Sequence, residues 1–212
     1  LELTNYLSCW NSNVASLAGL ESFENLHSLH LGNLNLGDEI DLSHIVSLKE
    51  IGIDSSTFTS IKVVDPSAIE KLELTYSDLL SYDLSAYTGL ISLNLSGNDG
   101  IIFDLSQVPN LKTLNLNNMS LDSLDLTHLN QLEHLSVYNN LLTDIDISHL
   151  NQLTYLDISS NDLTAITFTA EQSINNLNIA HNQFVSLDVS ALSVLNHLNA
   201  GGMSQLTNLV TS

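Results

Sequence analysis

A repeat with a period of 21 residues runs through almost the whole chain and restricts its fold more than any other feature. It is clearest in residues 132–152, LEHLSVYNNLLTDIDISHLNQ, after which Leu153 begins the same phrase again. The template is L-x-x-L-x-L-x-x-N-x-L-x-x-L-x-L-S-x-L-x-x, and its positions are numbered here from the first Leu. A chain built this way is expected to be a stack of similar coils, each stabilised by its neighbours.

Two aliphatic columns predict one short strand in every repeat. Position 4 reads Leu7, Leu29, Ile51, Leu72, Leu93, Leu114, Leu135, Leu156, Leu177 and Leu198. Position 6 reads Cys9, Leu31, Ile53, Leu74, Leu95, Leu116, Val137, Ile158, Ile179 and Ala200. Because side chains alternate along a strand, these two positions point into the core, and positions 3, 5 and 7 point to solvent. The period and spacing are those of leucine-rich repeats, so successive strands are expected to form a parallel sheet.

A second apolar pair predicts the opposite wall of each coil. Positions 14 and 16, such as Ile145 and Ile147, are again two residues apart, which favours a short extended segment. Only about five residues then lead to the next strand, too few for more than one helical turn. We therefore expect a leucine-rich-repeat solenoid, a horseshoe or arc of about ten coils. Its parallel sheet would line the concave face, and short extended or 3-10 segments would form the convex face.

The repeat continues without a linker or a break in composition, so residues 1–212 are expected to form one domain. Within it we expect a first coil at residues 1–25, regular repeats at 26–194 and a partial repeat at 195–212. Position 9 carries Asn98, Asn140, Asn161 and Asn182 in the most regular repeats. An inward-facing amide there is expected to bond backbone groups of neighbouring coils, and a Ser can do part of the same.

The charge of the chain excludes two classes of partner. It has 24 acidic residues, four Lys and no Arg, and a formal net charge of −20. Nucleic acids and anionic membranes are bound by clustered Lys and Arg, so neither is an expected partner. No apolar run approaches the roughly 18 residues of a spanning helix. The single Cys9 leaves no intrachain disulfide.

The repeats resemble those of bacterial internalins. The stretch VASLAGLESFENLHSLHL is similar to the start of a 22-residue internalin array. The stretch LTDIDISHLNQLTYLDISSNDL is similar to the 21-residue internalin subclass that has Cys at position 6, which only Cys9 retains here. The resemblance implies a secreted or surface-attached bacterial protein whose concave face binds a protein or a glycan. It transfers no contact residue, because ligand contacts in that family do not form a fixed motif.

Outward-facing strand positions offer two candidate binding patches. The first, called the unit 2 patch below, comprises His134, Tyr138, Tyr155, Asp157, Asn176 and Asn178. The unit 1 patch comprises Tyr6, Trp10, His27 and His30. Exposed aromatic residues with adaptable polar neighbours are common at protein and sugar contacts. The competing interpretations are that the unit 2 patch only covers the sheet and that Trp10 packs against an N-terminal cap.

Metal and catalytic sites have little support in the sequence. Asp144-x-Asp146 lacks the spacing of a calcium loop, and His128 and His149 are expected to be solvated turn residues. No nucleophile elbow, Walker loop or zinc spacing occurs, and Cys9 lies in an inward column. We expect a monomeric, non-enzymatic recognition module without metal or cofactor. A structural spacer or adhesin stalk and an intracellular effector scaffold stay open as alternatives.

Overall fold

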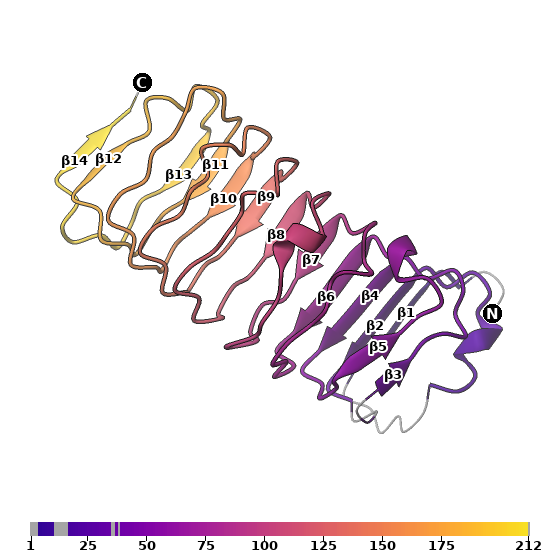
Figure 1. The fold of residues 1–212 in the computed structure, drawn as a ribbon. Coiled ribbons are helices and arrows are strands. Elements are labelled where there is room, and N and C mark those ends of the chain that lie inside the picture. Colours follow the sequence, from indigo (N-terminus) through magenta and orange to yellow (C-terminus); the bar gives the residue numbers. More distant parts are fainter. Residues whose placement is uncertain (1–3, 11–16, 35–36, 38, 212) are drawn as a thin grey trace. The chain divides into compact units, whose positions relative to one another are not determined.

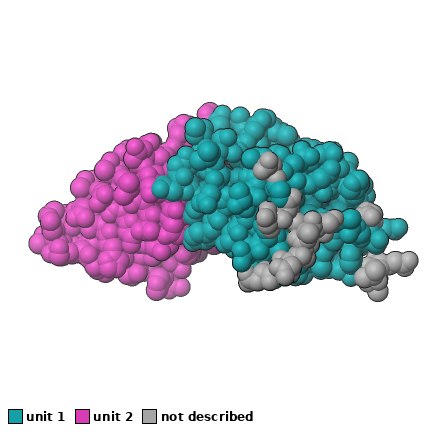
Figure 2. All heavy atoms as spheres, turned by 90° about the horizontal axis from the view of Figure 1, so that it is seen from below, with its two compact units in different colours: residues 1–108 teal, residues 109–212 magenta. Residues whose placement is uncertain are grey.

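The computed structural model describes residues 4–10, 17–34, 37 and 39–211, so parts of the predicted first coil lie outside the described residues. The chain divides into two compact units, unit 1 (residues 1–108) and unit 2 (residues 109–212), shown in different colours in Figure 2. In each unit, strands stack side by side and return segments lead from one strand to the next (Figure 1). The predicted parallel-sheet solenoid is confirmed. One continuous domain stays a prediction.

Unit 1 contains parallel strands in the order β1-β2-β4-β6-β7. Their bounds are Tyr6–Trp10, Ser28–Gly32, Glu50–Asp54, Lys71–Thr75 and Ser92–Asn94. On the return side, β3 (Glu39–Asp41) pairs with β5 (Ser60–Lys62). Three single-turn 3-10 helices complete this side, η1 (Leu20–Ser22), η2 (Pro66–Ala68) and η3 (Leu105–Gln107). The short extended and 3-10 segments predicted for this wall are therefore both present.

Unit 2 contains parallel strands in the order β8-β9-β10-β11-β13. Their bounds are Thr113–Asn115, His134–Ser136, Tyr155–Asp157, Asn176–Asn178 and His197–Asn199. On the return side, β12 (Ser186–Asp188) pairs with β14 (Asn208–Val210). The pairing keeps the register of the repeat, because Leu135 lies beside Leu156 and Leu156 beside Leu177. The strands β8, β9, β10, β11 and β13 all begin at template position 3, one residue before the first inward-facing position.

The two aliphatic columns form the core of each unit. Leu72, Leu74, Leu135 and Val137 have no exposed surface. Position 6 is aliphatic from Leu31 to Ile179, and these side chains form a buried hydrophobic ladder. Cys9 lies in the first described coil and is only half-buried. A coil covered by a neighbour on one side buries less of its apolar face than a coil covered on both.

The asparagine column forms the predicted ladder between coils. Asn140 Nδ2 donates to the carbonyl of Val137 in its own coil and to that of Leu116 in the preceding coil, at 2.9 and 2.7 Å. Its Oδ1 accepts from the N–H of Met119 at 3.1 Å. Ser56 does less, accepting from Leu34 N at 3.2 Å and donating to a carbonyl of its own coil. Asn therefore satisfies backbone groups that Ser leaves to other partners.

Aspartates at position 15 stabilise the turn that follows the return segment. Asp125 Oδ1 accepts from both the N–H and the hydroxyl of Thr127, at 2.9 and 2.8 Å. Asp146 Oδ1 accepts from the N–H of Ser148 at 2.9 Å. The same bond occurs at Asp41, Asp83, Asp104 and Asp188, and also at Asp65, which lies three residues beyond position 15 of its repeat. The sequence signal is Asp-x-Ser/Thr, which caps a turn through its carboxylate.

These turn bonds make a pH-dependent contribution to stability. The backbone bond from Ser148 holds the pKa of Asp146 below its usual value of 3.8. The carboxylate's contribution to the free energy of unfolding is therefore complete above about pH 4 and is lost as the pH falls through the lowered pKa. We expect Asp146→Ala to lower the thermal midpoint more at pH 6 than at pH 2, measured by circular dichroism. Asp144→Ala, an exposed neighbour, controls for the charge. An equal loss at both pH values would contradict the expectation.

Candidate functional site

The solvent-exposed side of the sheet in each unit is formed by positions 3, 5 and 7 and is called the strand face here. Both predicted patches lie on or beside it, one in each unit. Parallel strands place the same template position of successive repeats side by side, so each patch is a short row of neighbouring side chains.

The unit 2 patch is centred on two stacked rings. His134 and Tyr155 are direct partners in the pairing of β9 with β10, and their ring centroids are 5.1 Å apart at an interplanar angle of 8°. His134 is exposed, whereas desolvation by partial burial raises the pKa of Tyr155. Tyr138 follows β9 and is 39% exposed, and its N–H donates to Asn117 Oδ1 at 2.8 Å. The patch thus presents flat apolar surfaces that are held in place by their neighbours.

A polar row lies beside the stacked rings. Asn178 Nδ2 donates to Asp157 Oδ2 at 3.0 Å. Asp157 Oδ1 accepts from the N–H and the hydroxyl of Ser159, at 3.0 and 2.6 Å. Asn176 is the register partner of Tyr155 on the next strand. The structure therefore brings five of the six predicted residues together on β9, β10 and β11, with Tyr138 two residues beyond β9.

In the unit 1 patch, three of the four predicted residues belong to one cluster. The rings of Tyr6 and His30 have centroids 5.5 Å apart and are tilted by 39°. Trp10 Nε1 donates to Ser8 Oγ at 2.6 Å. His27 precedes β2, and its Nδ1 lies 2.6 Å from the carbonyl oxygen of Asn25. His27 therefore contributes to the edge of this patch and not to the hollow described next.

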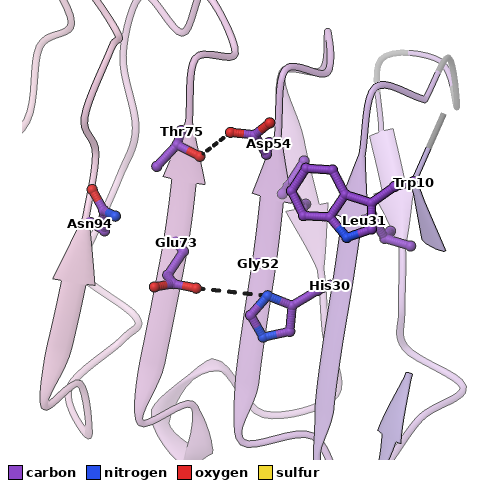
Figure 3. A pocket seen from close by; sticks show the side chains of 9 residues that line it. Trp10, His30, Leu31, Gly52, Asp54, Glu73, Thr75 and Asn94 are labelled. Carbon is purple, nitrogen blue, oxygen red and sulfur yellow. Dashed lines mark hydrogen bonds and ion pairs between the residues drawn. The ribbon is translucent and has the colours of Figure 1, made fainter. Parts of the chain in front are cut away.

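A hollow opens on the strand face of unit 1 (Figure 3). Its empty volume is ≈370 Å³, a figure that includes open solvent, so the hollow is a partly open depression and not an enclosed cavity. Its lining comprises Trp10, His30, Leu31, Gly52, Ile53, Asp54, Glu73, Thr75 and Asn94. Sequence analysis singled out Trp10 and His30 for this region and missed the polar residues on the following strands.

Two glycines make room for the rings of this hollow. Trp10 lies over Gly32 of the next strand, where an added Cβ would be 2.1 Å from Trp10 Cε3. His30 lies over Gly52 in the same way, with 2.3 Å between such a Cβ and His30 Nδ1. An aromatic residue followed one repeat later by Gly is a sequence signal that would have identified both pairs.

Carboxylates form the polar part of the hollow. Glu73 Oε2 lies 3.7 Å from His30 Nδ1, across Gly52 (Figure 3). Glu73 Oε1 lies 3.2 Å from Lys71 Nζ. Asp54 Oδ1 accepts from Thr75 Oγ1 at 2.6 Å, and Asp54 Oδ2 from Ser55 Oγ at 2.8 Å. The hollow is therefore lined by the indole of Trp10, the imidazole of His30 and the carboxylates of Asp54 and Glu73. The two rings lie over glycines of the neighbouring strands.

The other polar residues considered in the sequence have structural partners. Lys49 pairs with Glu70 at 3.2 Å, and Lys112 with Glu133 at 2.7 Å. His149 Nε2 lies 3.0 Å from the Leu126 carbonyl oxygen. Among the described residues, no three or more His, Cys, Asp or Glu side chains are grouped to hold a metal ion. No helix within those residues has the length and apolarity needed to cross a membrane.

Solved structures of leucine-rich-repeat proteins share this architecture. A leucine-rich-repeat protein of Leptospira interrogans matches 95% of the chain at 24% identity, with a TM-score of 0.77. The functional domain of InlJ from Listeria monocytogenes, which includes a cysteine ladder, matches 95% at 23% identity, with a TM-score of 0.66. The internalin InlF of the same species matches 98% at 23% identity, with a TM-score of 0.56, and 81% of its own chain is covered.

The chain has a leucine-rich-repeat fold. It is the fold of the Listeria internalins, in agreement with the resemblance seen in the repeats. This leucine-rich-repeat chain spans just over half of the length of the first two structures, 55% of the Leptospira protein and 54% of the InlJ domain. The family model of the leucine-rich-repeat domain of the endo-beta-N-acetylglucosaminidase EndoS matches residues 2–98. No curated protein matches the chain.

Proposed function

We propose that this leucine-rich-repeat chain is a non-enzymatic recognition module of a secreted or surface-attached bacterial protein. It acts as a monomer and binds a protein partner through the strand face of unit 2. The observation that carries the proposal is the His134–Tyr155 stack, exposed beside the bonded pair of Asp157 and Asn178. A structure with the same fold supports a protein partner, since the Arabidopsis receptor kinase HAESA was solved in complex with a peptide hormone and a co-receptor.

The physical argument is that the unit 2 patch is ordered before it binds. Stacking restrains both rings, and the bonds to Asp157 restrain the polar row, so little side-chain entropy remains to be lost on binding. Tyrosine combines a large apolar surface with a hydroxyl and is frequent at interaction hot spots. A partner that covers the patch gains apolar contact with the rings and hydrogen bonds with the polar row.

A glycan ligand is the second candidate. The match of residues 2–98 to the leucine-rich-repeat domain of an endo-beta-N-acetylglucosaminidase supports it. Sugars stack on aromatic rings and bond amides and carboxylates, all of which occur on both strand faces. Nucleic acid and anionic membranes stay outside the proposal, because a net charge of −20 repels both. A spacer or an intracellular scaffold would need no ligand on this face.

We expect Tyr155→Ala and His134→Ala each to weaken partner binding by about tenfold, because each removes half of the stack that an interface would bury. The protein is screened on glycan arrays and on arrays of extracellular proteins, and binders are quantified by surface plasmon resonance. Leu141→Ala, which truncates a side chain that is 52% exposed and outside the patch, is the control and should bind normally. Circular dichroism checks that all variants fold.

Two results would overturn this proposal. Unchanged binding by both Tyr155→Ala and His134→Ala would exclude the unit 2 patch. No binder on either array would favour the spacer, since a structural stalk presents repeats only for their length. A glycan binder that the Tyr155→Ala variant loses would replace the protein partner with the second candidate.

A further inference from the structure

We propose that the hollow on the strand face of unit 1 takes an arginine side chain of a basic protein partner. The proposal rests on the proposed function, because it specifies the chemistry of a partner that is recognised through the strand faces. It names the indole of Trp10 as the surface on which the guanidinium stacks and the carboxylates of Asp54 and Glu73 as its hydrogen-bond acceptors.

The first argument is the balance of donors and acceptors in the hollow. Among the described residues, each oxygen of Asp54 accepts one hydrogen bond and each oxygen of Glu73 lies within 4 Å of one basic side chain, whereas an ionised carboxylate offers about four acceptor positions. Two of the donors around the hollow are already used, since Thr75 Oγ1 donates to Asp54 and Trp10 Nε1 donates to Ser8, and the amide of Asn94 is a further donor in the lining. Spare acceptors with few spare donors favour a ligand that only donates. A guanidinium carries five N–H donors and no acceptor.

The second argument is the shape of the hollow. The ring of Trp10 lies over Gly32 and is still 49% exposed, so it offers an aromatic surface beside the carboxylates (Figure 3). A planar guanidinium stacks on such a ring while its edge bonds a carboxylate, which an ammonium group cannot match in geometry. The absence of a side chain at Gly52 lets the ring of His30 lie over that strand, with its Nδ1 3.7 Å from Glu73 Oε2.

The third argument is the charge around the hollow. Each of the four lysines of the chain lies within 4 Å of a carboxylate, in the pairs Lys49–Glu70, Lys62–Asp41, Lys71–Glu73 and Lys112–Glu133. The remaining acidic residues give the net charge of −20. The negative electrostatic field of this charge attracts a basic segment of a partner and repels an acidic one. It does not help to bind a neutral sugar. Charge therefore favours arginine over a glycan at this position.

The chain contains a single tryptophan, so the fluorescence of Trp10 reports directly on the hollow. The intact chain is titrated with an acetylated Gly-Arg-Gly-Arg-Gly peptide and with the same peptide containing citrulline, the neutral isostere of arginine. We expect a saturable change in emission with the arginine peptide and at least about tenfold weaker binding of the citrulline peptide, because charge-assisted hydrogen bonds are lost. Raising the salt concentration from about 50 mM to about 500 mM should weaken the binding of the arginine peptide and leave that of the citrulline peptide unchanged.

Matched variants test the two carboxylates. Glu73→Gln and Asp54→Asn keep the shape of the side chains, and each should lower the affinity for the arginine peptide by about fivefold. Glu70→Gln removes the same charge outside the hollow and should leave the affinity unchanged within about twofold. Thermal melts confirm that the variants fold, and the citrulline comparison tests the charge requirement without any change to the protein.

The proposal is overturned if the two peptides bind equally or if Glu73→Gln and Asp54→Asn bind the arginine peptide as the unchanged chain does. It is also overturned if oligomers of N-acetylglucosamine change the emission and the arginine peptide does not, since the hollow would then be a neutral glycan site. Failure of the proposed function is a separate result. The arrays with Tyr155→Ala test unit 2 and any partner of the chain, whereas the titration tests the unit 1 hollow alone.

Discussion

Replacing Asn161 by Leu is expected to lower the free energy of unfolding by about 2 kcal/mol. Asn161 is 4% exposed, and its Nδ2 donates to the carbonyls of Val137 and Ile158 at 3.0 and 3.1 Å. Its Oδ1 accepts from Leu142 N at 3.1 Å. Leucine fills the space but leaves the buried N–H of Leu142 without its partner, at a cost of about 1–3 kcal/mol. Each of the two carbonyls loses one of its two amide donors, since the Val137 carbonyl also accepts from Asn140 Nδ2 and the Ile158 carbonyl from Asn182 Nδ2. Urea denaturation followed by circular dichroism measures the loss.

Two further variants make this prediction specific to the ladder. Asn161→Ser should lower the free energy of unfolding by less than Asn161→Leu does. At the same template position, Ser56 accepts a hydrogen bond from the N–H of Leu34 in the preceding coil, so a serine can replace part of the amide's function. Asn151→Leu places the same substitution at an exposed turn and should change the free energy of unfolding by no more than about 0.5 kcal/mol. A loss at position 161 no larger than that at position 151 would show that the amide ladder contributes little to stability.

Gly89→Ala is expected to lower the free energy of unfolding by about 2 kcal/mol. A Cβ at position 89 would lie 2.1 Å from the carbonyl oxygen of Ser67 in the preceding coil. That oxygen belongs to the backbone, so a change of rotamer cannot remove the clash and the two coils must separate. The thermal midpoint and urea denaturation of the variant measure the cost.

A second glycine provides the control. At Gly201 the nearest atom to an added Cβ is Asn199 Oδ1 at 3.4 Å, which is an ordinary contact. Gly201→Ala should therefore leave stability unchanged or raise it by about 0.5 kcal/mol, because alanine restricts the unfolded chain. If Gly89→Ala were as stable as the unchanged chain, the prediction would be wrong, because the turn around Ser67 would then move to accommodate the added Cβ without loss of packing.

Some substitutions in the repeat could not be interpreted from the template alone. Position 14 of one repeat is Tyr82, whose hydroxyl lies 2.7 Å from that of Tyr87, and both side chains are buried. Burial raises the pKa of both hydroxyls, so the pair is neutral at ordinary pH. Gln172 lies in a repeat that lacks the usual Leu, and its Nε2 donates to the Ile147 carbonyl at 2.8 Å. These partners lie across the core or in the preceding coil, which a single repeat does not reveal.

The predicted patches illustrate the same limit. Placement of His134 beside Tyr155 follows from the 21-residue period, since parallel strands align equal positions. Their nearly parallel stacking depends on side-chain rotamers, which the period does not determine. In unit 1, Trp10 and His30 were predicted as patch residues, but Asp54 and Glu73, at outward positions 7 and 5, were not. The hollow exists because glycines follow the two aromatic residues one repeat later.

The amino-acid sequence by itself determined the solenoid, its strands, its aliphatic core and its asparagine ladder. These features depend on the alternation of side chains within a repeat and on the length of that repeat, both of which are local and occur many times over. The tertiary structure alone decided where the strand face is hollow and which groups line it. That outcome depends on which side chains lie across neighbouring coils, and a ring such as that of Trp10 can lie flat only where the next strand has no Cβ.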